Sequence, residues 1–134
     1  MQVLQGKKVL VVEDTAENMR LFSVLLRMAG AVVVEAIDGV SGVETAKREL
    51  PDLILMDIHM PGVDGLEATR RIRADAATAT IPVVAVTALV MPRDIEEIQQ
   101  VGCNGYLAKP IEPMLFAQQL AAHLNPVTES TSAT

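Results

Sequence analysis

Residues 53–65 read LILMDIHMPGVDG and carry a charge at the end of an apolar run. Leu53 to Met56 are four consecutive apolar residues, a pattern typical of a strand that is buried on both faces. Asp57 follows them directly, and Pro61, Gly62 and Gly65 then indicate a loop. The stretch therefore predicts a buried strand that delivers a carboxylate to its own carboxyl-terminal end.

Short apolar runs alternate with longer stretches of helical spacing along the chain. Strands are expected at residues 8–12, 31–36, 52–57, 81–87 and 105–108. Asp38 is expected to cap the second helix, Pro92 to begin the fourth and Gly102 to end it. Helical spacing directs five apolar sets toward the core, which are Phe22, Leu25, Leu26 and Ala29, then Val40, Val43, Ala46 and Leu50, then Leu66 and Ile72, then Ile95, Ile98 and Val101, and finally Phe116, Leu120 and Leu124. Five βα units in this order predict an α/β fold in which helices cover both faces of a parallel sheet.

The composition fits one domain with an aliphatic core. Half of the 134 residues are hydrophobic, yet the aromatic residues are two phenylalanines and one tyrosine. Cys103 is the single cysteine, so no disulfide can form within the chain and a reducing compartment is expected. The N-terminal residues lack the apolar run of a signal peptide, and no apolar stretch reaches the ~20 residues of a membrane span. We expect a cytoplasmic protein with no membrane partner.

The charge balance bears on nucleic-acid binding. The formal net charge is −6, whereas a nucleic-acid-binding domain normally has a basic surface. Arg70, Arg71 and Arg73 form the one basic cluster, and we interpret it as the solvated face of a helix. Direct nucleic-acid binding is therefore disfavoured.

Polar side chains follow the carboxyl-terminal ends of four of the expected strands. Glu13 and Asp14 follow the first strand, Asp57 ends the third, Thr87 and Ala88 end the fourth, and Lys109 follows the fifth. Ligands of a doubly wound sheet bind at this edge. Crowded acids repel one another unless a cation lies among them, and oxygen ligands without cysteine suit Mg²⁺. An aspartate beside Mg²⁺, with a lysine and a threonine opposite, is a candidate phosphoryl acceptor.

Each of these residues also has an ordinary explanation. Acids and threonines after strands often cap helices, an aspartate before a tight loop often serves the turn, and a Lys-Pro pair is common. Met56 and Met60 are interpreted as core and loop residues. The joint placement of the polar residues at four strand ends is what favours a functional site.

Four segments together resemble the receiver domain of two-component response regulators. They are VLVVEDTAENMRL, LILMDIHMPGVDGLEATRRIR, VVAVTA and GCNGYLAKPIE, and the likeness spans residues 7–124. The resemblance implies a flavodoxin-like, doubly wound (βα)5 fold whose five-stranded parallel sheet has the order 2-1-3-4-5. Residues 1–124 are then the receiver domain, and the Ser- and Thr-rich residues 125–134 are expected to be a disordered tail or a linker stub.

The resemblance implies a phosphorylation and metal site. Asp57 takes the role of phosphoacceptor. Asp14 and Asp57 take the role of direct Mg²⁺ ligands, the backbone carbonyl of His59 is a third ligand, and Glu13 acts through water. Mn²⁺ is expected to substitute for Mg²⁺ as the cofactor.

The resemblance also implies roles for the fourth and fifth strands. Thr87 and Ala88 stabilise the phosphoryl oxygens, and Lys109 pairs with the acceptor carboxylate or its phosphate. The Lys109–Pro110 peptide bond is expected to be cis. Tyr106 matches an aromatic switch position and moves inward as Thr87 moves.

The implied function is a signalling switch rather than an enzyme. A histidine kinase or a histidine phosphotransfer protein donates a phosphoryl group to Asp57, and the receiver catalyses only its own phosphorylation and dephosphorylation. Phosphorylation then alters the surface of residues 92–101, 105–108 and 113–124 for an unknown downstream protein. A monomer, or a weak dimer through this surface, is expected.

Two other functions are compatible with parts of the pattern. One is a small Mg²⁺-dependent phosphatase that turns over a free substrate through an aspartyl-phosphate. The other is a flavodoxin-like cofactor binder, although the acidic stretch EDTAENM replaces the phosphate loop that it needs. The receiver itself is either a stand-alone protein, which Met1 favours, or part of a hybrid histidine kinase.

Two histidines are further candidate site residues. His59 lies two residues after Asp57 and could be a metal ligand or a phosphohistidine, but we interpret its side chain as non-ligating. His123 is a lone histidine on the last helix and is expected at the surface.

Overall fold

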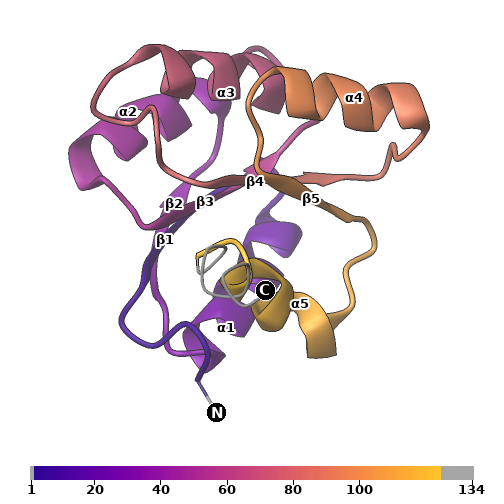
Figure 1. Ribbon diagram of the computed structural model, residues 1–134. Helices are drawn as coiled ribbons and strands as arrows, with labels where there is room; N and C mark the ends of the chain where they lie inside the picture. The colour runs from indigo at the N-terminus through magenta and orange to yellow at the C-terminus, as the bar shows by residue number, and fades with distance from the viewer. Residues whose placement is uncertain (1, 125–134) are drawn as a thin grey trace, which may run out of the picture.

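Five parallel strands form a sheet in the order β2-β1-β3-β4-β5, as predicted (Figure 1). The computed structural model describes residues 2–124, so the expected tail at residues 125–134 lies outside the described residues. The strands are β1 (Lys8–Val12), β2 (Val32–Ala36), β3 (Leu53–Asp57), β4 (Val83–Thr87) and β5 (Gly105–Ala108). The helices are α1 (Ala16–Met28), α2 (Gly39–Glu49), α3 (Gly65–Ala74), α4 (Pro92–Gln100) and α5 (Pro113–Ala121).

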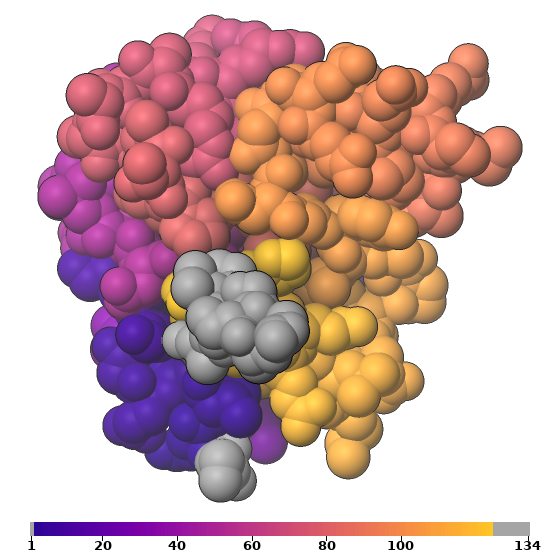
Figure 2. Space-filling view, viewed as in Figure 1, coloured from indigo at the N-terminus to yellow at the C-terminus, as the bar shows by residue number. Residues whose placement is uncertain are grey.

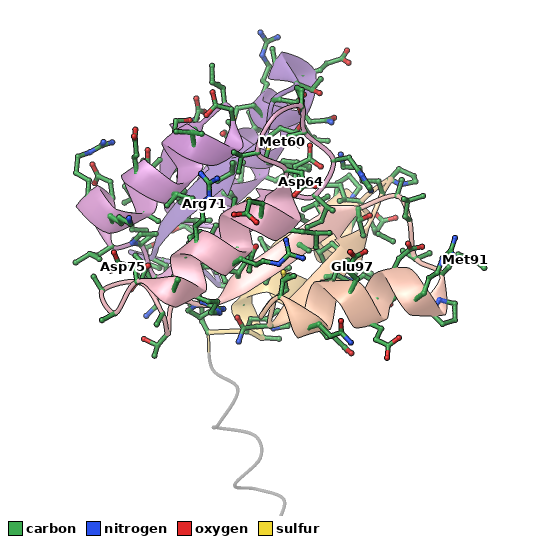
Figure 3. The ribbon with its side chains drawn as sticks, turned by 90° about the horizontal axis from the view of Figure 1, so that it is seen from above. Met60, Asp64, Arg71, Asp75, Met91 and Glu97 are labelled. Carbon is green, nitrogen blue, oxygen red and sulfur yellow. The ribbon has the colours of Figure 1, made fainter. Side chains whose placement is uncertain are left out.

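The helices cover the sheet on both faces. Helices α1 and α5 lie on one face, and α2, α3 and α4 lie on the other (Figure 1). Seen from above, α2, α3 and α4 run side by side, with Asp64 and Met91 at the starts of α3 and α4 (Figure 3). None of the helices within residues 2–124 combines the length and the apolar character needed to cross a membrane.

The central strands are buried because each of their two faces packs against a helix layer. In β1, Leu10 and Val12 point into the core under α2, α3 and α4, whereas Val9 and Val11 point into the core under α1 and α5. All residues of β3 and β4 are buried. The long apolar runs of the sequence are therefore strands with two covered faces.

Local sequence signals set the helix starts. Asp38 Oδ1 accepts a hydrogen bond from Ser41 N at 2.8 Å, so the predicted cap of α2 is confirmed. Asp64 Oδ1 accepts from Glu67 N at 2.9 Å and caps α3 in the same way. These caps fix where the loops after β2 and β3 end.

Three strands begin later than predicted. Strand β2 begins at Val32, because Ala31 N donates to Leu26 O at the end of α1. Asp52 lies before β3, where its carboxylate accepts a hydrogen bond from Lys8 N at 2.8 Å. Strand β4 begins at Val83, since Pro82 has no N–H to donate to a strand ladder.

Two of the residues predicted to face the core on α2 are exposed. Val40 is 46% exposed, and the buried positions of its turn are the glycines Gly39 and Gly42. Leu50 is 55% exposed because it ends α2 in a left-handed conformation, with φ of 45°, and turns outward. Leu124, predicted in the core, is half-buried.

Arg73 departs from the solvated face expected for the basic cluster. Its guanidinium donates to the backbone oxygens of Gly102 at 3.0 Å, Ile81 at 2.7 Å and Ala79 at 3.2 Å. It also donates to Asn104 Oδ1 at 2.8 Å. Arg73 therefore ties the end of α3 to the segments before β4 and β5, whereas Arg70 and Arg71 are exposed as predicted.

Replacement of Arg73 tests whether its hydrogen bonds to these segments stabilise the fold. Arg73→Lys should lower the free energy of unfolding by about 2 kcal/mol, because an ammonium group cannot donate to several backbone oxygens in the planar, branched geometry of a guanidinium. Arg70→Lys, on the exposed face of the same helix, should change it by less than about 0.5 kcal/mol. Urea unfolding of both variants measures the difference. Equal effects would show that the Arg73 hydrogen bonds contribute nothing specific.

Candidate functional site

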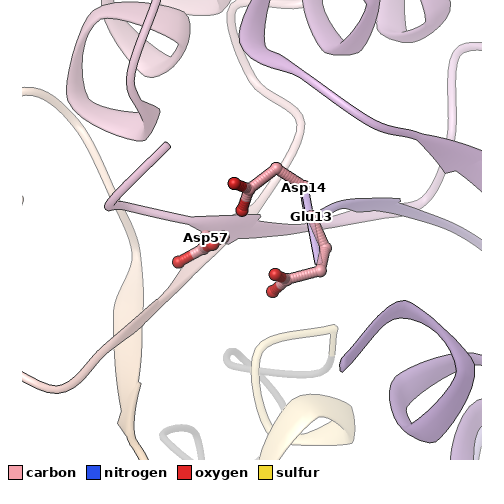
Figure 4. Close-up of side chains that lie close together, drawn as sticks. All are labelled: Glu13, Asp14 and Asp57. Carbon is pink, nitrogen blue, oxygen red and sulfur yellow. The ribbon is translucent and has the colours of Figure 1, made fainter. Parts of the chain in front are cut away.

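Three carboxylates meet at the carboxyl edge of the sheet. Strands β1 and β3 are parallel neighbours with Val12 opposite Met56, so Glu13 and Asp14 emerge beside Asp57. The carboxylates of the three acids lie close together in Figure 4, and one oxygen of each lies within 4.8 Å of the other two. The predicted convergence of these acids is present in the structure.

The carboxylate of Asp57 is buried and held through one oxygen. Asp57 is 2% exposed. Its Oδ1 accepts hydrogen bonds from Lys109 Nζ at 3.2 Å and from His59 N at 3.4 Å. Lys109 follows β5, and the peptide bond between Lys109 and Pro110 is cis, the isomer that the family resemblance implies. An ammonium group thus reaches the acidic cluster from the far side of β4.

The two oxygens of the Glu13 carboxylate differ in their partners. Oε2 accepts hydrogen bonds from Thr15 N at 3.1 Å and from Asn18 Nδ2 at 3.5 Å. Oε1 is buried and has no hydrogen-bond partner among residues 2–124. Burial raises the pKa of Glu13, and the nearby charge of Asp57 raises it further. Glu13 therefore accepts hydrogen bonds from the start of α1 through one oxygen and leaves its other, buried oxygen without a partner.

The donor set fits a hard divalent cation. A buried carboxylate oxygen without a partner is costly unless a cation or a donor approaches it. The Glu13 carboxylate, whose Oε1 has no partner, belongs to a cluster of three carboxylates and no sulfur, which is the ligand type that Mg²⁺ prefers. Glu13, Asp14 and Asp57 are the described residues that could hold such an ion.

Thr87 ends β4 and Tyr106 lies on β5, and neither side chain is hydrogen-bonded to Asp57 within residues 2–124. The buried hydroxyl of Thr87 accepts from Leu89 N at 3.0 Å and donates to Leu89 O at 3.3 Å. Tyr106 on β5 is 41% exposed. Ala88 is exposed and lines a groove of about 400 Å³ beside Lys109.

The two histidines differ from one another in their surroundings. The His59 side chain is exposed and lies outside the carboxylate cluster, and its backbone N–H contacts Asp57. His123 was expected at the surface but is half-buried, because its ring packs where Gly105 has no side chain. Burial lowers the pKa of His123.

Sequence reasoning missed two positions around the site. Asn18 in the first turn of α1 contacts Glu13. The sequence signal for its position was the spacing, because Asn18 lies one helical turn after Thr15. Gly65 permits α3 to start against β3, since a Cβ there would collide with the backbone oxygen of Asp57. Gly65 N donates to Ile58 O at 3.0 Å, which closes the loop back onto the end of the strand.

Comparison with known proteins assigns the chain to a family. The model of the response regulator receiver domain matches residues 9–121. The polar-differentiation response regulator DivK of Brucella anthropi is 41% identical over 118 residues, which are 88% of this chain and 96% of DivK.

Solved structures agree in fold. A chemotaxis protein of Vibrio cholerae, 29% identical, superposes with a TM-score of 0.84 over 88% of this chain and 98% of its own. The receiver domain of a sensor histidine kinase from Pseudomonas aeruginosa, 37% identical, superposes with a TM-score of 0.82 over 89% of this chain and 98% of its own. That structure holds a magnesium ion coordinated in the active-site cleft. The present chain therefore belongs to the response regulator receiver domain family of two-component signalling.

Proposed function

We propose that this receiver accepts a phosphoryl group from a phosphohistidine onto Asp57. The observation that carries the proposal is the environment of Asp57, a buried carboxylate at the end of β3 with two acids on one side and Lys109 Nζ at 3.2 Å on the other. The donor is a histidine kinase or a histidine phosphotransfer protein. The similarity to DivK, which is named as a response regulator, supports this class of partner.

The hydrogen bonds of Asp57 suggest which oxygen reacts. Both described donors, Lys109 Nζ and His59 N, contact Oδ1, so Oδ2 is the proposed nucleophile. Oδ2 attacks phosphorus, the P–N bond to the donor imidazole breaks, and its electron pair stays on the nitrogen. The products are an acyl phosphate on Asp57 and a free histidine. Lys109 stabilises negative charge near Oδ1 during the transfer.

We propose Mg²⁺ as the cofactor, with Mn²⁺ as a substitute. Asp14 and Asp57 would hold the ion directly with the backbone carbonyl of His59, and Glu13 would act through water. The ion would neutralise charge on the transferring phosphoryl oxygens. The free Glu13 Oε1 and the magnesium ion of the Pseudomonas aeruginosa neighbour support this assignment.

The proposed output is a change in the surface of α4, β5 and α5. The segments that contain these elements adjoin on one face of the molecule (Figure 2). In the described conformation Thr87 is hydrogen-bonded to Leu89 and Tyr106 is exposed. A phosphoryl group on Asp57 would draw the Thr87 hydroxyl away from Leu89, and Tyr106 would move inward.

The surface has the character of a protein-binding site. Several large apolar side chains are exposed on it or beside it, which are Leu89, Val90, Met91, Tyr106, Met114 and Leu115. A downstream protein, or a second copy in a weak dimer, would recognise its changed shape. We also propose that the protein is a switch that catalyses only its own phosphorylation and dephosphorylation. Residues 1–124 form the signalling unit, and the protein is located in the cytoplasm.

Labelling with a phosphodonor tests the acceptor. Asp57→Asn should reduce phosphoryl uptake from radiolabelled acetyl phosphate to background, because an amide is a poor nucleophile toward phosphorus. Asp75→Asn, which changes an acid at the opposite edge of the sheet (Figure 3), should label as the wild type does. Uptake by Asp57→Asn at the wild-type rate would refute the acceptor assignment, and release of phosphate over many turnovers would favour the phosphatase.

The raised pKa of Glu13 predicts a pH dependence of stability in the absence of metal. Above its unfolded pKa of 4.5, the native state keeps the Glu13 proton longer than the unfolded state does. The free energy of unfolding should therefore fall as the pH rises from 4.5 through the raised pKa. Asp38, Glu49 and Glu67 have lowered pKa values, so the stabilisation that they contribute is lost only at lower pH, below 3.8 for Asp38 and below 4.5 for Glu49 and Glu67.

Glu13→Gln should remove this fall, and Glu17→Gln, at an exposed position of α1, should retain it. Urea unfolding with a chelator at a series of pH values measures the two slopes. If Glu13→Gln and the wild type have parallel profiles, burial of the Glu13 carboxylate does not destabilise the metal-free protein.

A further inference from the structure

Asn18 is the one side chain within residues 2–124 that donates a hydrogen bond to the Glu13 carboxylate. It lies in the first turn of α1 and is half-buried. Its Nδ2 is 3.5 Å from Glu13 Oε2, and the other donor to this oxygen is the backbone N–H of Thr15. Neither donor contacts Oε1.

Because both donors bind the same oxygen, they fix the orientation of the Glu13 carboxylate. A carboxylate held by a single backbone N–H can still rotate about its last bonds, whereas two donors on the same oxygen restrict that rotation. With Oε2 held by Thr15 and Asn18, Oε1 is the oxygen left without a donor, and the Glu13 carboxylate is part of the cluster with Asp14 and Asp57. Asn18 thus has the position of a residue that orients an acid of the metal site without contacting the metal itself.

Asn18 also lines the groove of about 400 Å³ that contains Lys109 and Ala88. A polar residue in a groove needs no function, and the contact with Glu13 alone could be a helix-start interaction. Only Oε2 receives the donors, however, while the buried Oε1 of the same side chain has none. A contact that served only to satisfy a buried acid would not leave half of that acid unsatisfied.

We propose that Asn18 is a positioning residue for the metal site, holding Glu13 so that Oε1 faces the divalent cation. The inference rests on the proposed function, because it presumes that Mg²⁺ binds among Glu13, Asp14 and Asp57. Asn18 touches neither the cation nor the phosphoryl group in this role. Its effect is on the affinity for Mg²⁺ rather than on the transfer step.

Titration of Mg²⁺ alone, followed by calorimetry, tests the role. Asn18→Leu keeps a similar side-chain volume but removes the amide. It should weaken Mg²⁺ binding about tenfold, at the low end of the roughly 10- to 100-fold loss that follows when a residue supporting a metal-site side chain is replaced. Asn18→Ala should give a similar loss without adding an apolar group. Asn18→Gln keeps the donor and should stay within about threefold of the wild type.

Phosphorylation by acetyl phosphate gives a second readout. Asn18→Leu should need about tenfold more Mg²⁺ for half-maximal labelling of Asp57, while its rate at saturating Mg²⁺ should stay within about twofold of the wild type. The control is Gln118→Leu, which likewise replaces a side-chain amide by leucine, at an exposed position of α5. It should leave both quantities unchanged.

The outcomes separate the inference from the proposed function. Equal Mg²⁺ affinity of the wild type and Asn18→Leu would overturn the inference alone, as would an equal loss in Asn18→Leu and Asn18→Gln. A loss confined to the rate at saturating Mg²⁺ would also overturn it. A wild-type protein that binds no Mg²⁺ would overturn the proposed function and the inference with it.

Discussion

Repulsion among three carboxylates at one edge of the sheet is the constraint on which the site depends. Oxygens of Glu13, Asp14 and Asp57 lie within 4.8 Å of one another, and two of these acids are almost fully buried. The Lys109 ammonium at 3.2 Å from Asp57 offsets part of the repulsion. The buried Glu13 oxygen without a partner indicates that the compensation is incomplete without a cation.

The fold keeps the acids together despite this repulsion. Strands β1 and β3 are adjacent and buried on both faces, so the acids that follow β1 and end β3 cannot move apart without disturbing the core. On the other side of Asp57, Gly65 lets α3 start directly against the end of β3. Hydrophobic packing of an aliphatic core thus opposes electrostatic repulsion at its edge, and a bound ligand would relieve that repulsion.

The sequence allowed the parallel sheet and the acidic edge to be predicted, because both follow from periodic signals. Apolar runs such as residues 53–56 identify buried strands, and the residue after each run must lie at the carboxyl edge. Val40 and Leu50 were placed wrongly because helical spacing does not register glycines on the buried face or a left-handed helix end. Arg73 was placed wrongly on a solvated face because its partner Asn104 is brought to it by tertiary geometry. Asn18 was missed because its contact with Glu13 spans the turn between β1 and α1.

The effect of Mg²⁺ on unfolding tests the central claim most directly. Saturating Mg²⁺, at about 100 times its dissociation constant, should raise the free energy of unfolding of the wild type by about 2.7 kcal/mol. Asp14→Asn removes one exposed acid of the cluster, so it should be at least as stable as the wild type without metal and gain much less from Mg²⁺. If Mg²⁺ leaves the wild type unchanged, or stabilises both proteins equally, the carboxylate cluster is not the cation site that this account requires.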